Sequence, residues 1–237
     1  MEDAIDNPNS ESPVTGQDTE PLEKKGKDKS ERAYKIFLSG IRRAENLHKI
    51  NIDEKGHKLP IPEDKILDSY RAVVVLSISA LDAYVKTFLT AEIKQRITDR
   101  TLSSDLKAYI KDELFNKESL YHVVLDADFI DKVIEKFDLD FEKKSFQGQK
   151  SIDKYMKLAG IGQVFKEITK SANVSPDNLI GDLERYTTMR HLIVHCGDHD
   201  LNQTDLTENK ICEKDAIKCI ELVKLIATEI HKIYQAK

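Results

Sequence analysis

The stretch RHLIVHCGDHD, at residues 190–200, gathers side chains that could do chemistry. Within eleven positions it holds one arginine, three histidines and one cysteine. Imidazole can act as an acid or a base near neutral pH, guanidinium can bind phosphate through paired N–H donors, and imidazole with thiolate can bind zinc. The stretch therefore allows a catalytic site, a metal site, or a helix that simply ends in surface histidines.

The helix expected over residues 175–196 sets the relative positions of these side chains. One face carries the apolar residues Leu179, Leu183, Tyr186 and Ile193. Arg190 falls inside this apolar face, whereas His191 and His195, four residues apart, share a more polar one. At about 100° per residue, Arg190 and His195 lie roughly 140° apart around the helix axis. Only a long arginine side chain that bends toward the helix end could bring the two groups together, so the geometry allows their convergence without requiring it.

Zinc binding is one alternative for this stretch. His191 and His195, with Cys196 and His199 nearby, are ligand types that zinc accepts. The glutamate of the HExxH motif is missing, however, and Cys196 points about 100° away from His195 around the helix. We therefore expect neither a metal nor another cofactor. A further alternative is that His191 and His199 are surface residues near a helix C-terminus, where protonated imidazole is mildly favourable.

Hydrophobic periodicity assigns the elements that must position these residues to the all-α class, arranged as an antiparallel helical bundle. Residues 1–29 are rich in Asp, Glu, Ser, Pro and Lys and lack aromatics, so we expect a disordered tail outside one domain at 30–237. Period-two alternation persists nowhere. Helices are expected at residues 30–51, from 62 or 63 through 88, 105–115, 126–137, about 152–170, 175–196 and 214–234.

The strongest helical pattern begins near Pro62 and runs through Phe88. Its middle, RAVVVLSISALDAYV, is apolar nearly all round, which is typical of a central helix covered on most sides. Asp82 is the one charge between Arg71 and Lys86. Because an unpaired buried carboxylate is costly, an ion pair with an arginine or lysine is the structural explanation for it.

The composition is that of a chain that can bury a core of its own, with 237 residues, 40% of them hydrophobic, and a formal net charge of −5. Residues 1–29 hold eight acids and four lysines, so the rest of the chain is nearly neutral. A nearly neutral body gives no general attraction to nucleic acid. Any polyanion must therefore be held by a local patch or by two patches that meet.

Cysteine usage and hydropathy indicate the compartment. Cys196, Cys212 and Cys219 form no CxxC pair, and the N-terminus shows no signal-peptide pattern, so we expect the reduced cytoplasm. The longest apolar run, Ala72–Leu76, is far shorter than the roughly 20 residues of a membrane span. We therefore expect no association with a membrane.

A lysine-rich segment, KKSFQGQKSIDKYMK at residues 143–157, holds five lysines and one acid. The candidate RNA-binding residues in it are Lys143, Lys144, Lys150 and Lys154. Phe146 and Tyr155 lie among them and could stack on bases. The alternative is a solvated loop before the next helix.

Two segments carry a family resemblance. Arg190, four intervening residues and His195, near the end of a helix in an all-α bundle, resemble the RX4-6H signature of the HEPN superfamily. The segment DSYRAVVVLSISALDAYVKTFL, at residues 68–89, is similar to the long early helix of the RiboL-PSP-HEPN branch. RHLIVH is similar to the later motif helix of the same branch. The resemblance covers roughly residues 60–235 and leaves the tail out.

The resemblance implies a metal-independent endoribonuclease of a toxin, abortive-infection or antiviral system, working as a homodimer that unites two motif copies. It implies RNA as the substrate and allows an antitoxin or another protein partner. His191 matches a polar position that can assist, and Asp82 matches an acidic position that could orient Arg190 or His195. Toxins paired with nucleotidyltransferase antitoxins tend to show HxY after the arginine. Gly197 replaces that tyrosine here, so regulation by its modification is not expected.

Cleavage by the RNA 2′-hydroxyl needs a proton acceptor, a proton donor and positive charge beside the phosphorane. His195 suits proton transfer, and Arg190 suits the charge because a guanidinium does not deprotonate. One His195 per chain is too few for separate acid and base, so a two-fold pairing of the motif helices would supply the second. The rival interpretation is an inactive dimeric module that binds nucleic acid or a protein, which the nearly neutral body favours.

Overall fold

The computed structural model of the chain describes residues 22–50, 52, 56–58, 60–115, 126–199 and 208–236. Most of these residues lie in helices, and none of the described residues belongs to a β-strand. The predicted all-α class and helical bundle are therefore confirmed. The expected disordered tail lies outside the described residues up to position 21. The helix α1 begins at Leu22, inside the stretch 1–29 that was expected to form the tail.

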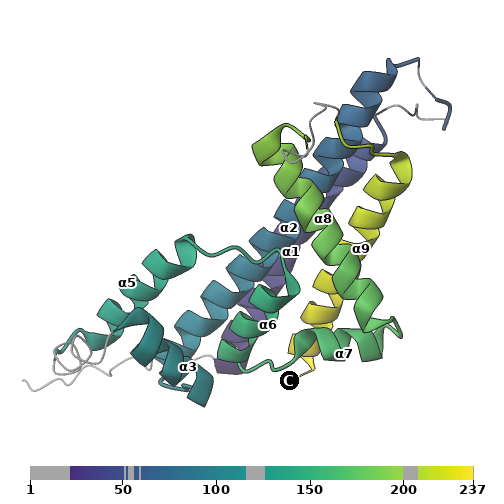
Figure 1. Ribbon diagram of the computed structural model, residues 1–237. Helices are drawn as coiled ribbons and strands as arrows, with labels where there is room; N and C mark the ends of the chain where they lie inside the picture. Colours follow the sequence, from purple (N-terminus) through teal and green to yellow (C-terminus); the bar gives the residue numbers. More distant parts are fainter. Residues whose placement is uncertain are drawn as a thin grey trace, which may run out of the picture.

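The helices follow one another along the chain as Figure 1 shows. They are α1 (Leu22–His48), α2 (Glu63–Thr98), α3 (Ser104–Tyr109), the π-helix η1 (Ile110–Leu114), α5 (Phe129–Glu142), α6 (Gln149–Leu158), α7 (Val164–Ser171), α8 (Pro176–Cys196) and α9 (Glu213–Gln235).

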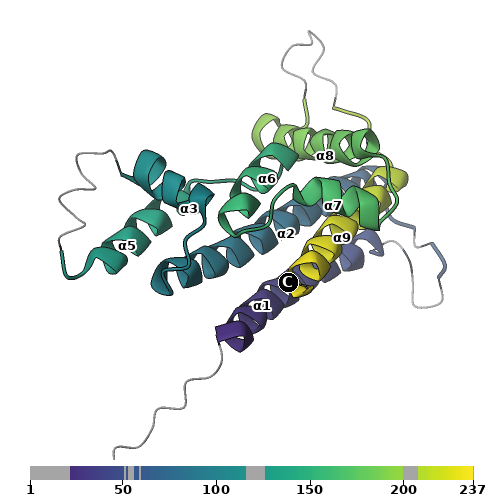
Figure 2. The same cartoon turned by 90° about the horizontal axis from the view of Figure 1, so that it is seen from below.

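The helix α2 is the centre of the bundle, as its apolar middle predicts. It packs against α1, α9, α8, α5 and α6, and Figure 2 shows it between α1 with α9 on one side and α6 with α8 on the other. By length and composition α2 could cross a membrane, but 56% of its most apolar window is buried against these neighbours. Burial in the core of the bundle therefore explains why α2 is so apolar.

The helices α1 and α2 approach each other closely. Gly40 on α1 allows this approach, because a Cβ built at that position would lie 3.0 Å from the Cβ of Ala80. Lys29 and Ser30, in the N-terminal half of α1, contact the bundle. Lys29 donates a hydrogen bond to Gln95 Oε1 at 2.7 Å, and Ser30 is buried, so this end of the helix is held against the bundle.

The segment after α2 begins with a capped turn. The Ser103 hydroxyl accepts a hydrogen bond from the Leu106 N–H at 3.1 Å, which satisfies one of the free amides at the start of α3. The chain then tightens into η1, where Phe115 N–H donates to Ile110 O at 3.0 Å. The predicted helix at 105–115 is thus present, but its second half has π geometry.

The single helix expected from about residue 152 to 170 is wrong in detail, because two helices replace it. Gly160 and Gln163 have positive φ angles of 77° and 51°, and such left-handed residues interrupt an α-helix. Asp153 on α6 then accepts a hydrogen bond from Phe165 N–H at 3.2 Å, which supports the start of α7. The hydrogen bond between Asp153 and Phe165 therefore links α6 to α7 across the break.

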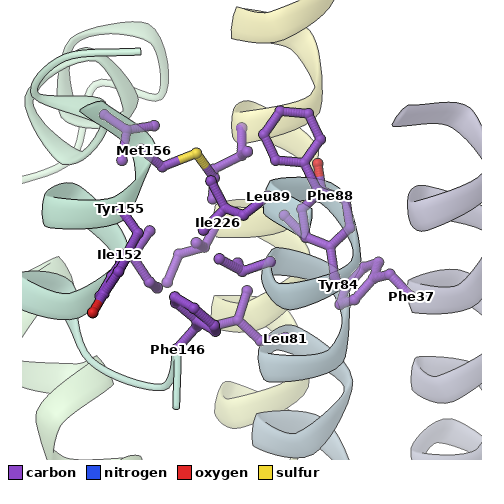
Figure 3. Packing of buried hydrophobic residues seen from close by; sticks show 14 of the residues in the cluster. Phe37, Leu81, Tyr84, Phe88, Leu89, Phe146, Ile152, Tyr155, Met156 and Ile226 are labelled. Carbon is purple, nitrogen blue, oxygen red and sulfur yellow. The ribbon is translucent and has the colours of Figure 1, made fainter. Parts of the chain in front are cut away.

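The lysine-rich segment is half loop and half helix, since α6 begins at Gln149. Phe146 and Tyr155 are buried, although the sequence suggested that they could stack on RNA bases. Figure 3 shows both rings in the core, on the side of α6 that faces α2. They contact each other edge to face, with ring centroids 5.3 Å apart. The stacking prediction is therefore wrong, because these aromatics fill the core.

Candidate active site at the end of α8

The helix α8 begins where the sequence predicts, with Ser175 as N-cap and Pro176 in the first turn. Its first half is anchored by the buried side chains of Leu179, Leu183 and Tyr186. Burial raises the pKa of the Tyr186 hydroxyl to about 12. Toward the end the helix rises out of the core, so that Val194 is 44% exposed. The first half of α8 is therefore fixed in the core, and its last two turns are accessible to solvent.

Arg190 and His195 meet on this surface. Arg190 Nη1 lies 3.4 Å from His195 Nε2, although the two residues start from different faces of the helix. A guanidinium can only donate hydrogen bonds, so His195 Nε2 is the acceptor in this pair. Arg190 is half-buried, and its Nε is buried without a hydrogen-bond partner among the described residues. The unpaired Nε is therefore out of reach of solvent in this conformation.

His191 completes a group of three polar side chains. Its ring centroid lies 4.8 Å from that of His195, with the ring planes at 45°, and both rings are exposed. One chain therefore presents a guanidinium and two imidazoles to solvent at the same point. These are the residue types that the sequence singled out for proton transfer and phosphate binding.

A sharp turn ends α8 directly after these residues. Gly197 and Asp198 both have positive φ, 60° and 66°, a region that glycine enters freely and aspartate tolerates. The Asp198 N–H donates to Leu192 O at 3.0 Å, which closes the last turn of the helix. Asp198 itself is only 3% exposed. Because of this turn, the Asp198 carboxylate lies buried in the protein.

Arg71 on α2 receives this carboxylate. Its Nε lies 2.5 Å from Asp198 Oδ2, and its Nη2 lies 2.8 Å from Glu208 Oε2 and 3.3 Å from Asn209 O. Burial lowers the pKa of Arg71, but the hydrogen bond and charge of Asp198 outweigh it and raise the pKa above its usual value. We call Arg71, Asp198, Glu208 and Asn209 the α8 latch.

The α8 latch also joins the two chain segments that follow α8 and precede α9. Asn209 Nδ2 donates to Asp198 O at 2.7 Å, and His199 pairs with Glu208 in an isolated antiparallel bridge. The end of α8 is therefore tied to α2 and to the start of the next segment. The α8 latch was not predicted from the sequence. A lone arginine, Arg71, at the edge of the most apolar run of the chain was the only hint of a buried ion pair.

Asp82 on α2 contacts the segment that precedes α6. Its Oδ1 accepts a hydrogen bond from the Phe146 N–H at 2.5 Å, and its Oδ2 accepts one from Gln147 Nε2 at 3.3 Å. Among the described residues no hydrogen bond or ion pair joins Asp82 to Arg190 or His195, so the prediction that Asp82 orients either of them stays a prediction. Its link to α8 is indirect, because Gln147 O accepts a hydrogen bond from Thr187 Oγ1 at 2.9 Å. Thr187 lies one turn before Arg190.

Two of the four candidate RNA-binding lysines already have counter-charges. Lys144 lies 3.0 Å from Asp140, and Lys154 lies 2.9 Å from Glu113. Lys143 and Lys150 are exposed and have no ion pair among the described residues. The segment that carries them touches α8 through Gln147 and Thr187. Contact with RNA stays a prediction for all four, and Lys143 and Lys150 have the more available charge.

The zinc alternative lacks a donor set in the described part of the chain. Across these residues no three side chains of His, Cys, Asp or Glu lie close enough together to hold one metal ion. His191, His195, Cys196 and His199, which share the end of α8, are included in that statement. Cys219 is buried elsewhere, and burial raises the pKa of its thiol to about 12.

Comparison with known protein families gives a match over most of the chain. The family model described as RiboL-PSP-HEPN matches residues 38–235, which is most of the chain. The match begins inside α1 and ends at the last residue of α9, so it includes both α2 and α8. No curated protein and no solved structure matches the chain.

Proposed function

The chain belongs to the RiboL-PSP-HEPN family, and from this premise we propose that it is a metal-independent endoribonuclease. Membership supports a function related to nucleic acid. The observation that carries the finer proposal is the pairing of Arg190 with His195 at 3.4 Å on an accessible surface. Guanidinium and imidazole at this separation could share one phosphodiester as their ligand.

The proposed reaction is attack of an RNA 2′-hydroxyl on the adjacent phosphorus. The bond from O2′ to phosphorus forms, the bond from phosphorus to O5′ breaks, and the products are a 2′,3′-cyclic phosphate and a 5′-hydroxyl. A base takes the proton of the 2′-hydroxyl and an acid protonates O5′. His195 Nε2, the acceptor in the pair with Arg190, suits the base. Arg190 suits the negative charge that builds on the phosphoryl oxygens.

The acid is the missing group in one chain, and we propose that a second copy provides it. In a two-fold dimer with the ends of α8 facing each other, His195 of the second copy would reach the same phosphate. The exposed Val194 and the half-buried Ile193 beside the site suit an apolar rim for such a contact. His191 would assist from 4.8 Å away, measured between the ring centroids of His191 and His195.

We place this activity in the cytoplasm, in a toxin, abortive-infection or antiviral setting, where an antitoxin or another protein could restrain it. The three cysteines form no disulfide, which suits a reducing compartment. Gly197 adopts the left-handed turn that ends α8. A tyrosine at this position would be strained, so control by tyrosine modification there is not expected.

The test is cleavage of RNA by the purified wild-type chain, with and without EDTA, and analysis of the product ends. We expect cyclic phosphate ends and cleavage that EDTA leaves unchanged. Arg190→Ala and His195→Ala should each lower the cleavage rate by roughly 100-fold or more. Arg100→Ala and His57→Ala remove the same residue types from exposed positions outside α8 and serve as matched controls. Loss of activity in EDTA would contradict the proposal.

A second candidate function is an inactive dimeric binding module for nucleic acid or a protein. The nearly neutral body favours it over an enzyme that must attract RNA. The same experiment separates the two. RNA binding without any cleavage by the wild-type chain, and binding that survives His195→Ala, would establish the module instead of the nuclease.

A further inference from the structure

The exposed charges of α1 have one sign from residue 29 to the end of the helix. The exposed charged side chains of this stretch are Lys29, Arg32, Lys35, Arg42 and Arg43. Both acids of the stretch are half-buried and already paired. Glu31 lies 3.4 Å from His231. Glu45 lies 2.8 Å from Lys224. Over these residues α1 therefore presents only positive charge to solvent.

The α1 basic face is our name for four of these side chains, Arg32, Lys35, Arg42 and Arg43. None of the four forms an ion pair or a hydrogen bond with another described residue. Lys29 is left out because it donates a hydrogen bond to Gln95 Oε1 at 2.7 Å. The four charges of the face are therefore available to a ligand.

Acids lie near the two ends of the α1 basic face but not within it. Residues 32–43, RAYKIFLSGIRR, contain the four cations and no acid. At one end, Asp28 is exposed one turn before Arg32. Beyond the other end, Lys49 and Glu221 line the same groove between α1 and α9, so their charges offset each other. The face therefore keeps an excess of positive charge when these neighbours are counted.

Helix geometry places the four cations in a row. At a rise of about 1.5 Å per residue, Arg32 and Arg43 lie roughly 16 Å apart along α1. At about 100° per residue, all four fall within an arc of roughly 100° around the helix axis. Ser39 is exposed in the same arc and can donate a hydrogen bond to a phosphate oxygen. The opposite side of the helix is buried through Ala33, Phe37, Ile41 and Ala44.

The α1 basic face lies away from the candidate active site. Among the described helices, α1 packs against α2 and α9 and makes no contact with α8. Figure 2 shows α1 and α8 on opposite sides of α2. A single phosphate therefore cannot touch the α1 basic face and His195 of the same chain.

We propose that the α1 basic face is a second nucleic-acid site, which binds the phosphate backbone of RNA without reading its bases. Three of the four cations are arginines, which hold phosphate through paired N–H donors. A row of cations with no acid among them matches a linear polyanion that carries one charge per nucleotide. The aromatic residues of α1 offer no ring for base stacking, because Tyr34 stacks on His231 and Phe37 is buried.

The apolar residues of α1 favour RNA over a lipid surface as the ligand. A helix that lies in a membrane interface buries a continuous apolar face in the lipid. The exposed apolar residues of α1, Ile36 and Leu38, lie at the two edges of the basic arc and not together. The site goes beyond the proposed nuclease, because backbone binding at α1 needs no cleavage at α8.

The test measures binding of fluorescein-labelled polyuridine and polycytidine to the full chain by fluorescence anisotropy. The His195→Ala background keeps the RNA intact. Strands of about 20 nucleotides exceed the length of the face at roughly 3.4 Å per nucleotide. We expect the two homopolymers to bind within about threefold of each other, since phosphate contacts carry no sequence information. Titrations between about 50 and 200 mM NaCl give the salt dependence.

The double variant Arg42→Gln/Arg43→Gln removes half of the face. It should weaken binding roughly tenfold at low salt and reduce the slope of log K against log salt by about 1.4, or 0.7 for each lost phosphate contact. Arg42→Lys/Arg43→Lys keeps the charge and should keep most of the slope. The matched control is Lys157→Gln/Lys166→Gln, at exposed positions on α6 and α7, which do not contact α1. All these side chains are exposed, so Tm should stay unchanged.

Two other occupants have their own arms. Residues 1–21 hold six acids and no lysine or arginine, and they precede α1 directly. Asp18→Asn/Glu20→Gln should leave RNA binding unchanged, and a gain of roughly tenfold would assign the face to residues 1–21 instead. Sedimentation with phosphatidylserine vesicles tests a lipid surface. Vesicle binding that Arg42→Gln/Arg43→Gln abolishes, in a chain that does not bind RNA, would assign the face to a membrane.

Equal loss of RNA binding in Arg42→Gln/Arg43→Gln and in the control variant would overturn the proposal, since the total charge alone would then explain binding. So would unchanged binding in the α1 variant. The nuclease is judged separately by cleavage. A chain that cuts RNA but binds it equally well without Arg42 and Arg43 rejects this site alone, and a chain that binds through α1 but never cuts rejects the nuclease alone.

Discussion

The two charges in the apolar part of α2, Arg71 and Asp82, make different kinds of contact. Arg71 meets an opposite charge, the buried carboxylate of Asp198 at 2.5 Å, and so ties down the end of α8. Asp82 meets neutral donors, a backbone N–H and an amide, and ties down the segment before α6. Both charges support α8, one directly at its end and the other through Gln147 and Thr187 one turn before Arg190.

The difference shows which charge is nearer to the chemistry. The family resemblance suggested a role in the site for Asp82, and the contacts that the structure shows for Asp82 are with Phe146 and Gln147. Arg71 holds Asp198, three residues after His195, and so fixes the helix end that presents the imidazole. Removal of one member of a buried ion pair leaves an uncompensated charge, which costs more than the loss of a neutral hydrogen bond. The two sites should therefore differ in mutants.

The largest expected effect follows from Arg71→Ala. It leaves Asp198 buried and unpaired, so we expect a loss of roughly 3–5 kcal/mol in the free energy of unfolding, measured by urea denaturation. Asp198→Asn in the Arg71→Ala background removes the orphan charge and should recover part of the stability. A loss below about 1 kcal/mol in the single variant would show that the latch is not a stabilising pair.

Asp82→Ala should have the next largest effect. It leaves the Phe146 N–H without its acceptor, so we expect a loss of roughly 1–3 kcal/mol in unfolding free energy. RNA cleavage, if the proposed activity is present, should fall far less than in His195→Ala, because Asp82 contacts neither motif residue. Asp82→Asn keeps one acceptor oxygen and should be milder. Normal stability with cleavage as low as that of His195→Ala would support a role for Asp82 in the site.

Asp215→Asn tests a carboxylate that caps α9. Burial raises the pKa of Asp215, but hydrogen bonds from Cys212 and the charge of Arg185 outweigh it and lower the pKa overall. A lowered folded-state pKa stabilises the fold above the unfolded value of about 4, and this contribution is lost as the pH falls through the folded value. We expect Asp215→Asn to cost roughly 1 kcal/mol at pH 7. The difference from wild type should shrink below about pH 4 in urea denaturation.

The smallest expected effect is that of Arg185→Ala. Arg185 forms a close ion pair with Asp215 at 2.5 Å, as Arg71 does with Asp198, but its side chain is 50% exposed. We therefore expect a loss of less than about 1 kcal/mol, reduced further in high salt. Urea denaturation at low and at high NaCl measures both. A loss as large as that of Arg71→Ala would mean that burial does not explain the difference between the two pairs.

Most of the helices could be predicted because their periodic apolar residues describe the surfaces that they bury. The pattern around Tyr70, Leu81 and Phe88 predicted α2 as the central helix, and Ser175-Pro176 predicted the start of α8. The break between α6 and α7 was missed, although Gly160 and Gly162 lie within it. Apolar residues on both sides continued a helical spacing, and such spacing does not report a left-handed residue such as Gln163.

For the site, residue types and spacing determined which groups could do chemistry, namely Arg190, His191 and His195 on one helix. They also left the convergence of Arg190 and His195 open. The tertiary structure decided it, because the bend of a side chain depends on what surrounds it. It also decided the α8 latch, since Arg71 and Asp198 lie 127 residues apart. Local spacing reflects interactions within one helix, whereas the partner of a buried charge depends on how separate helices pack.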